Sequence, residues 1–132
     1  DWQQLAVIET MVRDLNLDIS VHRVPLVREP DGLAMSSRNR NLSTEERQKA
    51  LSLSRSLEDA KKKIRQGTTA TSQLKQSIKD IITAESGMRI DYISICDPSS
   101  LQEIDEVKGR TLIALAVKIG SSRLIDNCIV ED

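Results

Sequence analysis

Apolar side chains recur at helical spacing in three separate stretches of the chain. The first covers residues 2–15, the second runs from 44 to about 65 and the third from 72 to about 86, each with one apolar face at a period of about 3.6 residues. Ser43 and Glu46 have the spacing of a capping box ahead of the second stretch. The pattern therefore predicts three amphipathic helices. The apolar positions are Leu5, Ile8, Val12 and Leu15; Leu53, Leu57, Ala60 and Ile64; and Leu74, Ile78, Ile81 and Ile82.

Short runs rich in β-branched residues predict strands. Residues 19–24 alternate in polarity, and Pro25 then ends regular pairing. Residues 89–96 are rich in isoleucine, and residues 111–119 form a long apolar run typical of a buried strand. A tight glycine–serine turn separates that run from a last strand at 123–130, so these two strands are expected to form a hairpin.

The order of these elements divides the chain into two parts. A helix followed by a strand in residues 1–26 is typical of the C-terminal end of an α/β domain. Residues 27–132 predict an α+β domain in which two helices pack on a small, mostly antiparallel sheet. The chain begins at Asp1 without an initiator methionine, so we expect it to be cut from a longer protein.

The segment Arg28–Arg40, at the junction of the two parts, has no hydrophobic periodicity. It opens with a Pro-Asp-Gly turn and continues with two small hydroxyl side chains, Ser36 and Ser37, followed by Arg38. Small hydroxyls let an anion approach backbone N–H groups, and an arginine grips phosphate oxygens with two donors. The segment is therefore a candidate phosphate-binding loop, and a solvated loop without a ligand is the alternative.

The amino-acid composition argues against several classes of function. The 19 basic and 20 acidic residues balance to a net charge of −1, and Trp2 and Tyr92 are the only aromatic residues, which argues against nucleic-acid binding. Cys96 and Cys128 lie far apart, so we expect two reduced buried thiols and neither a disulfide nor a metal site. No apolar run reaches the length of a membrane span. The single histidine, His22, has no nearby partner and receives no role.

Three blocks in the chain resemble the pantothenate synthetase (pantoate–β-alanine ligase) family. They are Asp1–Leu5, Val27–Asn39 and Arg123–Asn127, and they occur in the family's order across essentially the whole chain. Met35–Arg38 resembles the family's version of the Lys-Met-Ser-Lys-Ser loop of class I aminoacyl-tRNA synthetases. The family's His-x-Gly-His motif, which binds ATP, is absent from this chain, as is the lysine expected before Asp1.

The resemblance implies an ATP-dependent ligase that acts in two steps. Pantoate attacks the α-phosphate of ATP to give pantoyl adenylate and pyrophosphate, and the amine of β-alanine then gives pantothenate and AMP. Mg²⁺ accompanies the ATP. Residues 1–26 would end a Rossmann-like nucleotide-binding domain, and residues 27–132 would form a lid. The resemblance also implies a cytoplasmic homodimer. The N-terminal domain of the same chain would be a partner of this fragment, and without that domain we expect little or no ligase activity.

The resemblance also implies roles for individual residues. Ser36, Ser37 and Arg38 are the expected catalytic residues on the phosphates, Val27 and Met35 would meet the adenine through backbone groups, Asp1 would meet the ribose, and Gln4 would hydrogen-bond pantoate. Arg28, Arg40 and the Arg123–Asn127 segment are given structural roles. Two alternatives stay open: a non-catalytic interaction or dimerisation domain, and a related adenylate-forming nucleotidyltransferase that uses a different acid.

Overall fold

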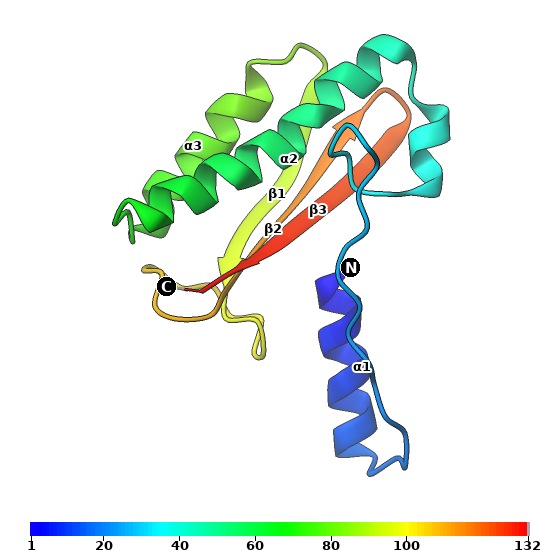
Figure 1. Cartoon of the computed structure of the whole chain (residues 1–132), viewed down its shortest axis with the longest axis vertical. Helices are drawn as coiled ribbons and strands as arrows, with labels where there is room; N and C mark the ends of the chain where they lie inside the picture. The colour runs from blue at the N-terminus through cyan, green and yellow to red at the C-terminus, as the bar shows by residue number, and fades with distance from the viewer. Residues whose placement is uncertain (132) are drawn as a thin grey trace.

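The computed structural model describes residues 1–131, which form three α-helices, one 3₁₀ helix and a three-stranded sheet. Helices α2 and α3 pack together on one face of the sheet, whereas α1 projects away from it (Figure 1). The elements are α1 (Trp2–Asp14), η1 (Ser37–Asn41), α2 (Thr44–Arg65), α3 (Thr71–Thr83), β1 (Met88–Cys96), β2 (Thr111–Ile119) and β3 (Ser122–Val130). The α+β arrangement predicted from the pattern is confirmed.

The sheet is antiparallel in the order β1-β2-β3, with the apolar β2 in the centre. Ile119 pairs with Ser122, so β2 and β3 form the predicted hairpin across a two-residue turn. Gly120 takes a φ of +53° in that turn, a backbone conformation that disfavours side chains with a Cβ. The register between β1 and β2 shifts between Ile90 and Tyr92.

The core lies between the sheet and the two long helices. The predicted apolar stripes of α2 and α3 face inwards, except that Ile81 is only partly buried and lies outside the core cluster. Leu57 and Ile78 meet the β2 side chain Leu115 in the core, and all three are fully buried. Alternate β2 residues point to the opposite face, where Leu112 lies in a smaller cluster with Trp2 of α1 packed against it. Because both faces of β2 are covered, its sequence is apolar without alternation.

Residues 1–26 differ from the predicted pattern. The helix forms, but of the predicted apolar face Ile8 and Leu15 are 39% and 64% exposed, and Ala6 is the buried residue of α1. Residues 19–24, predicted as a strand, carry no strand pairing in the structure. A strand requires a hydrogen-bonded neighbour, and the part of the chain that the structure describes provides none beside this segment. No helix within residues 1–131 is long and apolar enough to cross a bilayer.

Candidate functional site

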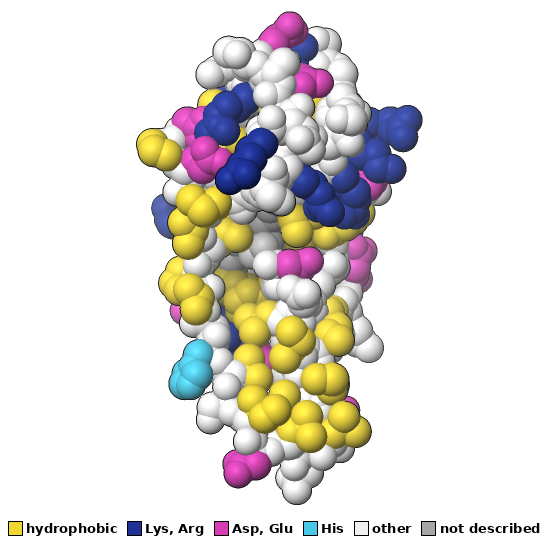
Figure 2. Space-filling view, turned by 90° about the vertical axis from the view of Figure 1, so that its right-hand side faces the viewer, with side chains coloured by type: hydrophobic (Ala, Val, Ile, Leu, Met, Phe, Trp, Pro, Cys, Tyr) yellow, Lys and Arg dark blue, Asp and Glu magenta, His cyan; other side chains and the backbone are white. Residues whose placement is uncertain are grey.

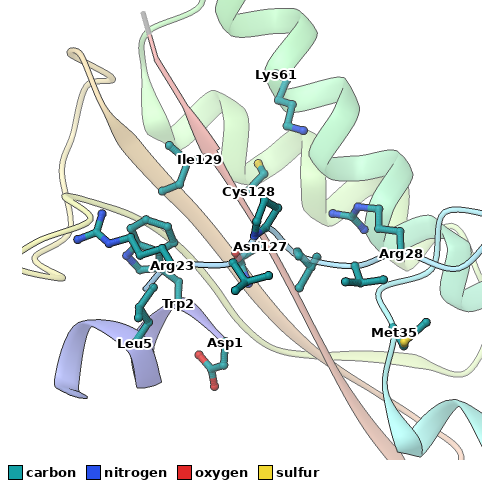
Figure 3. Close-up of a pocket in the computed structure, with 14 residues that line it drawn as sticks. Asp1, Trp2, Leu5, Arg23, Arg28, Met35, Lys61, Asn127, Cys128 and Ile129 are labelled. Carbon is teal, nitrogen blue, oxygen red and sulfur yellow. The ribbon is translucent and has the colours of Figure 1, made fainter. Parts of the chain in front are cut away.

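A cavity of about 610 Å³ lies between α1, the segment that follows it, α2 and β3 (Figure 3). Its volume is within the range of small-molecule sites. Three of the residues predicted to bind ligand line it: Asp1, Val27 and Met35. The other lining residues are Trp2, Leu5, Arg23, Val24, Pro25, Leu26, Arg28, Lys61, Asn127, Cys128 and Ile129.

The backbone fixes the relative positions of the predicted adenosine-binding residues. The N–H of Met35 donates to the carbonyl of Val27 at 3.0 Å, so the two residues sit side by side although the Pro-Asp-Gly turn lies between them. Asp1 caps α1, because its carboxylate accepts from the N–H groups of Gln3 at 2.9 Å and Gln4 at 3.4 Å. Its side chain remains exposed at the cavity, beside the N-terminus of the helix.

The predicted phosphate-binding residues lie outside the cavity wall. Ser36 caps η1, with its Oγ accepting from the N–H of Arg38 at 3.2 Å. Ser36, Ser37 and Arg38 are all exposed, and one Arg38 Nη donates to the Arg123 carbonyl at 3.4 Å. Gln4 is also exposed and is not part of the wall. The structure therefore gathers the predicted adenosine residues and leaves the phosphate and pantoate residues outside.

Arg28 ties the start of the loop to the sheet. Its guanidinium donates to both carboxylate oxygens of Asp126 in β3, at 2.8 and 3.0 Å, and to the Gly32 carbonyl at 3.1 Å. The Asp126 side chain is only 1% exposed. The hydrogen bond to Asp126 raises the pKa of Arg28 above its ordinary value, so the guanidinium stays charged. These contacts support the structural role predicted for Arg28.

Arg47 of α2 ties the same loop to the helical layer. Its Nη2 donates to Glu29 at 2.7 Å, and its Nε donates to Asp31 at 2.9 Å. Asn39 in η1 donates to the other carboxylate oxygen of Glu29 at 2.7 Å. These hydrogen bonds, from Arg47 first and Asn39 second, lower the pKa of Glu29. No role was predicted from the sequence for Arg47 or Glu29.

Lys61 of α2 also lines the cavity, although it was not predicted as a site residue. Its side chain is only 23% exposed, lines the cavity and pairs with Glu58 at 2.6 Å, although Lys61 belongs to a run of three lysines (Lys61–Lys63) of the kind that usually forms a solvated helix face. The signal was present, because Lys61 lies four residues after Leu57 on the apolar face of the helix.

The thiols of Cys96 and Cys128 are both buried and unpaired, as predicted. Burial raises the pKa of Cys128, beside the cavity, to about 12, and burial also raises the pKa of Cys96. A thiol with so high a pKa carries almost no thiolate near neutral pH and is a poor nucleophile. Within residues 1–131, no group of three histidine, cysteine, aspartate or glutamate side chains is arranged to hold a metal ion.

Trp2 connects α1 to the sheet domain. Its indole N–H donates to the carbonyl of Pro98 at 2.9 Å. The guanidinium groups of Arg23 and Arg110 lie 5.2 and 5.4 Å from the ring centroid, within the range of cation–π contacts. Arg23 is held in turn by both carboxylate oxygens of Glu9, at 2.6 and 2.7 Å. The cavity wall is thus braced where α1 meets the sheet.

The site combines apolar walls with hydrogen-bonding groups at its edge. Val24, Leu26 and Val27 offer apolar surface to a flat ring, and the Asp1 carboxylate can accept hydrogen bonds from hydroxyl groups. The exposed hydroxyls and arginine of the neighbouring loop suit an anionic group. The arrangement is therefore chemically suited to a nucleoside that carries a phosphate chain.

Several known proteins are similar to this chain in sequence and in fold. A family model described as Pantoate-beta-alanine ligase matches residues 1–129. Pantothenate synthetase from Acetivibrio thermocellus is 51% identical over 99% of this chain and 47% of its own length, and the Heliobacterium modesticaldum enzyme is 55% identical over the same shares. The chain thus spans about half the length of these curated relatives.

Solved structures agree with the sequence match. The crystal structure of pantothenate synthetase from Thermus thermophilus superposes with a TM-score of 0.91 at 38% identity, covering 97% of this chain and 46% of the other. Pantoate-beta-alanine ligase from Francisella tularensis, complexed with Beta-gamma ATP and Beta-alanine, gives a TM-score of 0.59 at 27% identity over 98% of this chain and 40% of the other. With a family match across nearly the whole sequence, the chain belongs to the pantoate–β-alanine ligase family.

Proposed function

We propose that this chain is the C-terminal part of an ATP-dependent ligase that condenses pantoate with β-alanine to form pantothenate, AMP and pyrophosphate. The observation that carries the proposal is the cavity that brings together Asp1, Val27 and Met35. The resemblance of the sequence to the family assigns the adenosine of ATP to these three residues. The Francisella tularensis relative, which is complexed with Beta-gamma ATP and Beta-alanine, supports ATP and β-alanine as substrates.

The proposed binding mode follows the chemistry of the cavity. Adenine lies against the paired backbone segments of Val27 and Met35, and the Asp1 carboxylate accepts from ribose hydroxyls. Gln4, one helical turn from Asp1, hydrogen-bonds pantoate at the N-terminus of α1. Mg²⁺ enters with the nucleotide phosphates as part of the substrate.

The proposed reaction has two steps. A pantoate carboxylate oxygen attacks the α-phosphorus, the bond to the bridging oxygen breaks, and pyrophosphate leaves with its electron pair. The β-alanine nitrogen then attacks the acyl carbon of pantoyl adenylate, AMP leaves, and the nitrogen loses a proton to solvent. Negative charge grows on the departing pyrophosphate, so donors from Ser36, Ser37 and Arg38 lower the barrier. Because these residues lie outside the cavity wall, the proposal includes closure of residues 27–132 as a lid.

We also propose that the two parts of the chain belong to different domains of the enzyme. Residues 1–26 belong to the end of a Rossmann-like nucleotide-binding domain, and residues 27–132 form the C-terminal domain. The apolar face of α1, left exposed here, supports packing against further parts of the N-terminal domain. We propose that the complete enzyme is a cytoplasmic homodimer and that this chain alone has little or no activity.

The test is AMP release by the full-length gene product given pantoate, β-alanine and Mg²⁺-ATP, together and with each one omitted. AMP formation that requires pantoate and is completed only with β-alanine would support the ligase. AMP formation with another acid in place of pantoate would support a different nucleotidyltransferase. A folded protein that forms no AMP with any acid would favour an interaction domain.

A further inference from the structure

Arg47 is the point at which two carboxylates of the loop converge on helix α2. Its Nη2 lies 2.7 Å from Glu29 and 2.8 Å from Asp31, and its Nε donates to Asp31 at 2.9 Å. All three side chains are about one-quarter to one-third exposed, so the cluster is partly shielded from water. A planar guanidinium presents several donors in fixed directions, which lets one arginine hold two carboxylates at once.

Glu29 transmits this contact to the 3₁₀ helix of the loop. One of its oxygens accepts from Arg47, and the other accepts from the Asn39 amide at 2.7 Å. The same amide nitrogen donates to the Ala34 carbonyl at 3.0 Å, and Asn39 is buried. Asn39 directly follows Arg38 in η1. A continuous chain of hydrogen bonds therefore runs from α2 to the backbone that carries the three exposed phosphate-binding candidates.

The base of the loop is held on two sides while its tip is exposed. Arg28 fixes one side to Asp126 of the sheet, and Arg47 fixes the other side to α2. Asn39 is the buried residue of η1, whereas Ser37 and Arg38 in the same helix are exposed. This geometry places a rigid support under side chains that reach towards solvent.

We propose that Arg47 is a positioning residue that, through Glu29 and Asn39, sets the place of Ser36–Arg38 for the transfer of the ATP α-phosphate. It touches no substrate itself. The inference rests on the proposed function, in which that loop stabilises the departing pyrophosphate. Without Arg47, Glu29 and Asp31 face each other as like charges, Glu29 is no longer held in place, and Asn39 keeps only the Ala34 carbonyl as a fixed acceptor, so η1 can shift. A displacement of about 1 Å in catalytic groups can slow a reaction by about 100-fold.

The experiment measures pantoate-dependent exchange of pyrophosphate into ATP by the full-length enzyme, which isolates the first step. We expect R47A to lower kcat for exchange by about tenfold or more, with the KM for pantoate nearly unchanged. R47K keeps the positive charge but lacks the planar guanidinium that contacts Glu29 and Asp31 at once, so its kcat for exchange should lie between those of wild type and R47A. The matched control is R55A, which removes another arginine of α2 whose partner, Glu85 at 2.8 Å, lies away from the loop.

A second readout separates positioning from general damage. When enzyme-bound pantoyl adenylate is formed beforehand and β-alanine is added, AMP release by R47A should match wild type, because the pyrophosphate has already left. Equal slowing of both steps in R47A, or equal exchange rates in R47A and R55A, would overturn the positioning role. If R47A does not fold, E29Q gives the same test with side-chain size retained, and an unchanged exchange rate would again overturn it. A wild-type enzyme without exchange would instead reject the proposed function.

Discussion

Two arginines hold the same loop in different environments, and burial decides what each contact contributes. Asp126, the partner of Arg28, has a side chain only 1% exposed, whereas the partners of Arg47 are 26% and 31% exposed. A buried carboxylate has lost its hydration and depends on its partner, whereas a solvated one can exchange a cation for water. At the residue scale, the Arg28–Asp126 pair therefore matters most for folding and the Arg47 cluster for geometry.

Replacing Asp126 with asparagine tests this distinction. We expect D126N to lower the free energy of unfolding by about 2 kcal/mol or more, because the amide NH₂ faces the Arg28 donors and leaves polar groups unpaired. Urea denaturation of this chain measures the change. D91N is the control, since Asp91 accepts from Arg123 at 2.7 Å at the surface of the sheet. Equal losses in the two variants would show that burial of Asp126 is not decisive.

Arg38 and Gln4 should affect different kinetic constants of the full-length enzyme. We expect R38A to lower kcat by about 100-fold or more, because in the proposed reaction the Arg38 contact strengthens as charge develops on pyrophosphate. Q4A should raise the KM for pantoate more than the KM for ATP. R40A, an exposed neighbour in η1, is the control and should leave kcat unchanged. Steady-state kinetics with each substrate varied in turn checks all three, and an R38A kcat equal to that of R40A would remove Arg38 from the catalytic residues.

At the scale of elements, local signals predicted most of the fold. The capping box at Ser43, the apolar stripes of α2 and α3, and the run in β2 all depend on residues near one another in sequence, and all are confirmed. The prediction of a strand at residues 19–24 was wrong, because strand formation depends on a distant pairing partner that a local pattern cannot reveal. Lys61 was not predicted as a cavity residue, because a run of three lysines is typical of a solvated face and hides its place four residues after Leu57.

The candidate site was predictable in part, for the same reason. The resemblance implies that Asp1, Val27 and Met35 bind adenosine, and the structure shows that all three line one cavity. Arg47 and its carboxylates went unnoticed, because the arginine lies 16 residues from Asp31 and only folding brings them together. Arg38 lies outside the cavity wall, and its sequence motif could not predict this because the motif says nothing about three-dimensional position.

The two long helices offer a paired test of capping. Ser43 caps α2 with a complete capping box, whereas Ala70, the N-cap of α3, makes no side-chain hydrogen bond. We expect S43A to lower the free energy of unfolding by about 1 kcal/mol and A70S to raise it by about 0.5 kcal/mol, because each change removes or adds an acceptor for an unpaired N–H group. Urea denaturation of both variants measures the two effects. Shifts of the same sign would contradict the capping argument.

At the scale of the whole molecule, exposed apolar residues are confined to one end. Every large hydrophobic side chain that is exposed in the described structure lies between Val7 and Met35, on α1 and the segment after it. Figure 2 shows this apolar surface in the lower half and basic side chains gathered above it. Within residues 36–131 no large apolar side chain is exposed, so the apolar surface of that region is covered by its own fold, whereas that of the preceding residues is not.

The exposed apolar surface should be visible to a hydrophobic dye. We expect this chain in isolation to bind 1-anilinonaphthalene-8-sulfonate while fully folded, because contiguous apolar patches offer the dye a site. Replacing Val7, Met11 and Leu15 together with glutamine should lower the dye fluorescence without changing the cooperative unfolding of the sheet domain. Dye fluorescence that is unchanged in the triple variant would place the bound dye elsewhere.

Stability should also decrease in acid. Several carboxylates have a pKa below its ordinary value because they accept hydrogen bonds: Glu29 from Arg47, Asp59 from Lys63, Asp91 from Arg123 and Asp97 from the backbone of Ser100. A carboxylate with a lowered folded-state pKa stabilises the fold above its unfolded value and loses that effect as pH falls through the folded value. We therefore expect a constant urea midpoint from pH 7 to about 5 and a falling one below about 4.5. A midpoint that rises in acid would contradict the assignment.

Trp2 gives this chain a built-in optical reporter. It is the single tryptophan, and its indole lies at the contact between α1 and the sheet, bonded to Pro98 and flanked by two guanidinium groups. Emission from an indole shifts in wavelength and intensity when water and charge around it change. Any rotation of the sheet domain relative to α1 would alter that environment. The proposed lid closure on adding nucleotide could therefore be followed in real time, without a label, in a full-length enzyme in which any tryptophan other than Trp2 has been replaced by phenylalanine.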